Sequence, residues 1–154
     1  MRIALTLFLT IFSLQAAGQT FFPWMEKAYK QENPNELAYF LLVHPDCPVT
    51  EEEGESILEG VLVRSRIKPL VRPAWVSRPL YLSVSLECIK PKNNNPVFQI
   101  IARFGDVSGE IPIFYFPDYG FFGIGPKDSM KTAFQGRVEA AITDYLKANF
   151  DLGD

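Results

Sequence analysis

The sequence predicts an α+β fold in two layers, with helices packed mainly on one face of a three-stranded antiparallel sheet. Three observations support this prediction. Apolar and polar residues alternate over residues 80–89, turn-forming residues separate the apolar segments that follow, and an apolar stripe at helical spacing lies near the C-terminus. The chain has 154 residues, of which 47% are hydrophobic and 21% charged, a composition typical of globular proteins. Residues 19–154 are expected to form one domain.

Residues 1–18 have the pattern of a secretory signal peptide. Arg2 is followed by an apolar segment at 3–14 and by small residues at 16–18. Because a helix needs about 20 apolar residues to span a bilayer, no transmembrane anchor is expected. We expect cleavage after Gly18, with a cut after Ala17 as the alternative, and a mature protein that is periplasmic or secreted. The alternative is an amphipathic helix that begins the fold.

Two short helices are predicted next. Residues 22–31 place Pro23 in a first helical turn and carry apolar side chains available for burial. For residues 34–43, Asn33 can cap a helix and Pro34 suits its first position. The apolar cluster within this segment fits a helix or a buried strand, and the capping pattern favours the helix.

A third helix is predicted over residues 51–64. Thr50 and Glu53 have the spacing of a capping box, and apolar residues then recur at helical spacing. The segment 64–79 is punctuated by prolines, which cannot donate hydrogen bonds to a sheet. We therefore expect extended chain or an edge strand there.

Three strands follow, at about 80–89, 97–104 and 111–116. The first alternates most regularly between apolar and polar residues, and short polar segments separate all three. Consecutive strands with short connections predict an antiparallel meander. A glycine-rich and aromatic loop is expected at 121–126, and a final helix at 128–149 carries an apolar stripe at helical spacing.

The two cysteines are Cys47 and Cys88. In an oxidising compartment an even number of cysteines in a small domain predicts a disulfide. The alternative is a free nucleophilic Cys47 assisted by His44, although short spacing along the chain is weak evidence for a catalytic pair.

Composition excludes several classes of function. Eighteen acidic residues against fifteen basic ones give a net charge of −3, which does not suit a protein that coats nucleic acid. One histidine and two cysteines cannot build the usual zinc sites without carboxylates. No metal, cofactor or nucleic-acid partner is predicted.

Charge is unevenly distributed along the chain. From Glu26 to Glu59 there are nine acidic and two basic residues, whereas residues 60–86 contain five basic residues and no acidic one. This second segment could form a basic edge that binds an anionic partner. Its candidate residues are Arg64, Arg66, Lys68, Arg72, Trp75 and Arg78. Alternatively, these residues pair with the acidic helix before them or keep an edge strand soluble.

A second candidate surface is aromatic. Strand alternation turns neighbouring side chains to opposite faces, so part of the aromatic set near residue 120 could lie in a groove. Its residues are Tyr115, Tyr119, Phe121 and Phe122. The alternative is that they fill the core.

No catalytic residues are predicted. His44 precedes a proline where a chain commonly turns, and the carboxylates at 51–55 suit the first turn of a helix. We therefore expect an exported, non-catalytic binding domain whose partner is another envelope protein or an anionic envelope component. The alternatives are a hydrolase or transferase acting on the envelope, with His44 and carboxylates in its site, and an inhibitor or immunity-type protein that blocks another enzyme.

Overall fold

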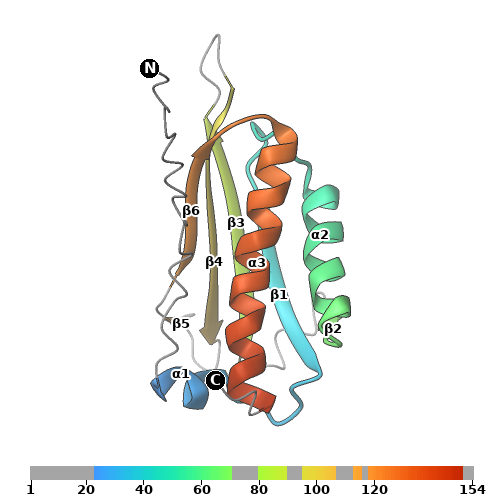
Figure 1. Cartoon of the computed structure of the whole chain (residues 1–154), viewed down its shortest axis with the longest axis vertical. Helices are drawn as coiled ribbons and strands as arrows, with labels where there is room; N and C mark the ends of the chain where they lie inside the picture. Colours follow the sequence, from blue (N-terminus) through green and yellow to red (C-terminus); the bar gives the residue numbers. More distant parts are fainter. Residues whose placement is uncertain (1–22, 71–79, 90–94, 107–112, 116–117, 151–154) are drawn as a thin grey trace, which may run out of the picture.

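The computed structural model shows a mixed α+β fold, with two long helices on one face of an open sheet (Figure 1). The structure describes residues 23–70, 80–89, 95–106, 113–115 and 118–150. The expected signal peptide at 1–18 lies outside these residues, so its removal stays a prediction. Among the described residues, no helix has the length and hydropathy needed to cross a membrane.

The sheet is mixed and has six strands within the described residues. Its order is β2-β1-β3-β4-β5, and β6 pairs with β4 as well. The strands are β1 (Glu36–Val43), β2 (Lys68–Leu70), β3 (Leu80–Ile89), β4 (Val97–Asp106), β5 (Ile113–Phe114) and β6 (Tyr119–Ile124). β1 is parallel to β2 and to β3, whereas β3 with β4, β4 with β5 and β4 with β6 are antiparallel.

The predicted three-stranded meander is therefore correct only for its first pair of strands. β3 has the predicted bounds, and β4 begins at the predicted residue. Of the strand expected at 111–116, the described residues show β5, and most of the loop expected at 121–126 belongs instead to strand β6. The glycines of that segment are typical of a loop, but Phe121, Phe122 and Ile124 are aromatic or β-branched residues, which favour a strand.

The helix predicted at 34–43 is wrong, because residues 36–43 form β1. The Asn33 side chain accepts a hydrogen bond from the backbone N–H of Asn35 at 3.3 Å, so the capping pattern marks a turn that leads into a strand. Leu37 and Ala38 face opposite sides of the sheet, yet each is only 1% exposed. An apolar run buried on both sides is typical of a central strand with parallel neighbours.

Three helices appear in the described residues: α1 (Pro23–Tyr29), α2 (Glu51–Arg64) and α3 (Lys127–Phe150). The predicted bounds of α2 and its capping box are confirmed. The Glu53 backbone N–H donates to Thr50 Oγ1 at 3.2 Å, and Thr50 N–H donates to Glu53 Oε2 at 3.0 Å. The other two helices overlap their predicted segments within a few residues.

α2 is held against both the sheet and α3. A Cβ at Gly54 would lie 3.0 Å from Leu41 Cδ2, so glycine allows a close approach between α2 and β1. Glu53 also binds two lysines of α3, with Lys127 Nζ at 2.7 Å and Lys131 Nζ at 2.8 Å. Hydrogen bonds from Lys127 and Lys131, followed by the backbone of Thr50, lower the pKa of Glu53 to about 2.

The core lies between the two long helices and the sheet face that they cover. It includes Leu82, Val84, Leu86, Ile100 and Phe104 of the sheet, all fully buried. Phe134, Val138, Ile142 and Tyr145 of α3 pack against this layer. Burial of this apolar surface is the main stabilising contribution.

The two ends of the described chain are joined by Asn149, in the last turn of α3. Its Nδ2 donates to the carbonyl oxygen of Tyr29 at 2.9 Å, and its Oδ1 accepts from Gln31 N–H at 2.8 Å. Tyr145 O–H donates to the carbonyl of Pro34 at 3.1 Å. The end of α1 and the turn before β1 are thereby fixed to the C-terminal helix.

Candidate functional site

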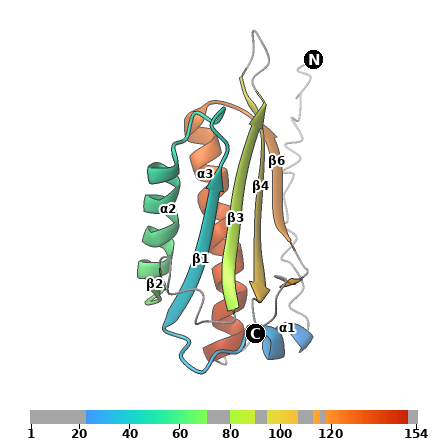
Figure 2. The ribbon, with the colours of Figure 1, turned by 180° about the vertical axis from the view of Figure 1, so that it is seen from behind.

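The candidate site lies on the sheet face that α2 and α3 leave uncovered, called here the outer face (Figure 2). Because successive side chains of a strand point to opposite faces of the sheet, every second residue of each strand lies on this face. They come from even-numbered residues of β1 and β6 and odd-numbered residues of β3 and β4, which the pairing register places side by side. In these four strands, the odd-numbered residues of β1 and β6 and the even-numbered residues of β3 and β4 point toward the helices.

Four apolar side chains gather at one corner of the outer face: Ile89, Val97, Phe122 and Ile124, called here the apolar corner. Ile89, Val97 and Ile124 form one cross-strand row, and Phe122 belongs to the next row, opposite Gln99. Ile89 is 72% exposed, Phe122 69% and Ile124 68%. Since isolated exposed apolar residues are common but contiguous ones are not, the cluster is a candidate binding surface.

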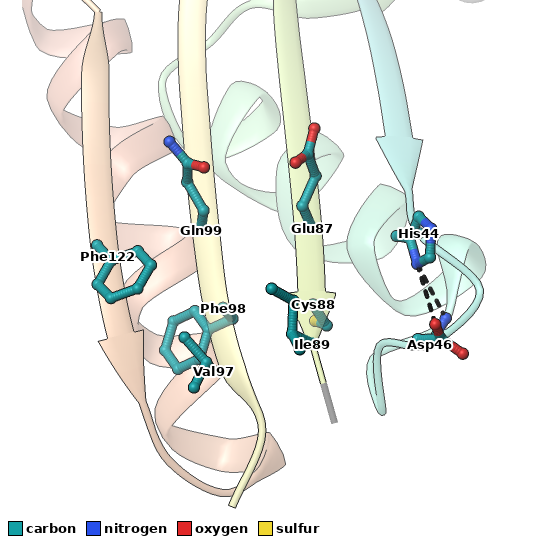
Figure 3. Close-up of a pocket in the computed structure, with 9 residues that line it drawn as sticks. All are labelled: His44, Asp46, Glu87, Cys88, Ile89, Val97, Phe98, Gln99 and Phe122. Atoms are coloured by element: carbon teal, nitrogen blue, oxygen red, sulfur yellow. Dashed lines mark hydrogen bonds and ion pairs between the residues drawn. The ribbon is translucent and has the colours of Figure 1, made fainter. Parts of the chain in front are cut away.

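A hollow of about 620 Å³ lies at this corner (Figure 3). It is lined by His44, Asp46, Glu87, Cys88, Ile89, Val97, Phe98, Gln99 and Phe122. The lining combines apolar side chains with the carboxylates of Glu87 and Asp46 and the amide of Gln99. The described lining residues include no lysine or arginine.

The predicted disulfide between Cys47 and Cys88 is confirmed. It links the turn after β1 to the end of β3, next to the hollow. Both sulfurs belong to buried residues, and the backbone N–H of His44 donates to Leu86 O at 2.9 Å beside them. The alternative of a free nucleophilic Cys47 is therefore wrong.

His44 and Asp46 form the rim of the hollow on the side of β1. Asp46 N–H donates to His44 Nδ1 at 3.3 Å, and the Asp46 carboxylate lies 3.7 Å from the same nitrogen. The His44 side chain is 51% exposed and that of Asp46 is 64% exposed, so both are accessible to solvent and neither lies in an enclosed pocket. Among the described residues, no group of three histidine, cysteine or acidic side chains is placed to hold a metal ion.

The three described basic residues of the predicted edge do not form one extended face. Arg64 ends α2, Arg66 has a left-handed backbone with φ of 60°, and Lys68 begins β2. Arg64 lies 3.4 Å from Glu139 of α3, and Lys68 lies 3.2 Å from Glu36 of β1. Both acidic partners lie outside the acidic helix that precedes this segment.

The remaining residues of the predicted basic edge lie outside the described residues: Arg72, Trp75 and Arg78.

The four predicted aromatic residues are separated by the sheet. Tyr119 is buried on the helix-facing side, where its O–H donates to Asp144 Oδ2 at 2.9 Å, so it does not belong to a surface. Tyr115 is half-buried and donates to Asp106 Oδ2 at 3.2 Å. Phe121 points toward the helix side and is 38% exposed, and Phe122 alone lies on the outer face. The alternation of β6 divides the set.

The sequence-based reasoning missed Ile89, Val97 and Ile124. A signal for one of them exists in β3, where Tyr81, Ser83, Ser85 and Glu87 mark the more polar phase of the alternation. Ile89 is an aliphatic residue in that phase. Its position therefore indicated an exposed apolar side chain.

Comparisons with known proteins give the chain no family. No family model matches the sequence, and no curated protein is similar to it. Among solved structures, a dodecamer of a PelC point variant from Paraburkholderia phytofirmans aligns with 15% identity and a TM-score of 0.48, covering 72% of this chain and 89% of that chain. A PelC dodecamer from the same organism in another crystal form aligns with 13% identity and a TM-score of 0.46, covering 70% and 87%.

Proposed function

We propose that this protein is an exported, non-catalytic binding domain that holds an apolar segment of another envelope protein at the apolar corner. The observation that carries the proposal is the contiguity of Ile89, Phe122 and Ile124, each more than two-thirds exposed, beside the hollow. Binding is favourable at an uncovered apolar surface of this kind, because the partner removes the apolar side chains from water.

The charges around the hollow favour a protein partner over an anionic ligand at this surface. Glu87 and Asp46 contribute carboxylates to the described lining, and no described lining residue contributes a positive side chain. An anionic envelope component would meet like charge here. An apolar segment that carries a basic residue would meet complementary charge.

The disulfide contributes to the site by fixing its rim. Cys47 directly follows Asp46 and lies three residues after His44, and Cys88 directly precedes Ile89 in β3. The covalent link therefore holds the rim at a fixed position relative to the apolar corner. A fixed surface loses less conformational entropy when it binds.

Photo-crosslinking in cells tests the proposal. A photoreactive residue replaces Ile89 in one strain and Val63 in another. Val63 is 62% exposed but lies on α2, away from the outer face. We expect a defined adduct with one envelope protein from position 89 and not from position 63.

The captured protein is then purified and titrated against charge variants. Ile89→Glu should weaken its binding by about tenfold or more, whereas Val63→Glu should leave binding unchanged. Equal adducts at the two positions, or binding that Ile89→Glu does not change, would show that the apolar corner is not the contact surface.

A further inference from the structure

The open edge of β6 differs from the edge strands that proteins usually protect. β6 pairs with β4 along one side, and no described strand pairs with its other side. Its sequence from Tyr119 to Ile124, YGFFGI, contains no charged residue and no proline. An uncharged, apolar edge strand presents backbone groups that can pair with another strand.

The opposite edge of the same sheet has the usual protection. β2 is only three residues long and contains Lys68 and Pro69. Lysine and proline at an edge both discourage pairing with a further strand. The contrast identifies β6 as the edge suited to extension.

The register shows which backbone groups of β6 face outward. Gly125 N–H donates to Pro96 O at 3.2 Å, in register with the ladder between β4 and β6. Because hydrogen-bonded positions alternate along an antiparallel pair, Phe121 and Gly123 direct their backbone groups toward β4. The backbone N–H and C=O groups of the alternate residues therefore point away from β4: Gly120, Phe122 and Ile124.

We propose that β6 pairs with β6 of a second copy of this chain, antiparallel, about a two-fold axis at Phe122. This register places Phe122 opposite its own copy and Gly120 opposite Ile124 of the other copy. Each of these pairs uses the outward-facing backbone groups. The two sheets then form one continuous sheet, and the symmetric contact closes at two copies.

Side-chain size supports this register. Ile124 stands opposite glycine, and on the helix-facing side Phe121 stands opposite Gly123 of the other copy. A Cβ at Gly120 would meet no heavy atom within 4 Å, so space is open on the outer face beside β6. An aromatic residue across from a glycine is a favourable cross-strand arrangement.

Charge also favours pairing between identical strands. A two-fold axis brings each charged residue near its own copy, which is destabilising when the two are directly opposite. β6 has no charge to oppose itself. The pairing also brings the two apolar corners together on one face. This inference goes beyond the proposed function and does not depend on it.

Charge complementation at position 122 tests the proposal. Phe122 is 69% exposed, so Phe122→Lys and Phe122→Glu should both fold, as the thermal unfolding midpoint would verify. We expect the unchanged protein to sediment as a dimer and each variant to dimerise about tenfold or more weakly. An equimolar mixture of the two variants should restore dimers, because lysine then lies opposite glutamate.

Ile89→Lys is the matched control. Ile89 is exposed in the same apolar corner but lies on β3, away from the open edge. This variant should keep the dimer intact, although the proposed function expects position 89 to matter for partner binding. The two proposals can therefore fail separately.

Several results would overturn the pairing. The unchanged protein could remain monomeric at about 100 µM, a concentration at which a micromolar dimer is almost fully assembled. Assembly beyond two copies would contradict a closed two-fold contact. Dimers that persist in both charge variants, or a mixture that stays monomeric, would exclude a two-fold axis at Phe122.

Discussion

Removing the disulfide should lower the stability of this protein by about 4 kcal/mol. The bond between Cys47 and Cys88 closes a loop with a sequence separation of 41. For a loop of this length, the chain-entropy model gives an unfolded-state entropy loss worth about 4 kcal/mol at 25 °C. This is a large share of a typical unfolding free energy of about 5–15 kcal/mol. The double variant Cys47→Ala/Cys88→Ala tests the estimate.

Urea denaturation of the double variant measures the loss. With a slope of about 2 kcal/mol per molar urea, typical of small proteins, the midpoint should fall by roughly 2 M. Each single alanine variant should lose about as much as the double variant, because either substitution breaks the same bond. A reducing agent should destabilise the unchanged protein similarly and leave the double variant unaffected. Additive losses in the single variants, or a midpoint that hardly moves, would refute the reasoning.

Three further predictions concern the core and the ion pairs. Glu53→Gln should flatten the acid side of the stability profile, measured by urea titration from pH 5 to 2. The native pKa of Glu53 is lowered to about 2 from 4.5, so its contribution is present above pH 4.5 and lost as pH falls toward 2. Burial raises the pKa of Asp144, so its ionised form opposes folding at neutral pH. Asp144→Asn, which keeps an acceptor for Tyr119, should raise the unfolding midpoint at pH 7, with a gain that shrinks toward pH 4. Phe104→Ala should lower the unfolding free energy by about 3–5 kcal/mol, because this fully buried ring lies 4.4 Å from Tyr29 between ring centroids.

Local patterns were sufficient where the apolar period along one segment was unambiguous. The capping box at Thr50 and Glu53 predicted the start of α2, and its apolar spacing predicted the end. The alternation from Leu80 to Ile89 predicted β3 with its bounds. In both cases the local pattern agrees with the contacts made to neighbouring elements, so those elements did not change the outcome.

β1 could not be predicted in this way, because its conformation depends on distant residues. Its partners are Leu82 and Val84 in β3 and Pro69 in β2, which follow it by tens of residues. An apolar run of this length is ambiguous without its neighbours, and the turn at Asn33 resembles a helix cap. Pairing with strands on both sides decides between the two conformations.

The candidate site was predicted only in part for a related reason. Phe122 and the disulfide were identified from residue type. Ile89 and Val97 lie on neighbouring strands whose register brings them together with Ile124. A surface that spans several strands is defined by the register of the whole sheet, which single segments do not encode.

The attachment of Asn149 to the first helix has a consequence for biosynthesis. A ribosome adds this side chain only after all the described strands have been made. Until then, the carbonyl of Tyr29 and the amide of Gln31 lack the partners that they have in the finished molecule. The nascent chain therefore completes the attachment of the first helix only after the described strands have been synthesised. Premature termination before Asn149 should leave an otherwise assembled sheet with a loosened first helix, accessible to proteases.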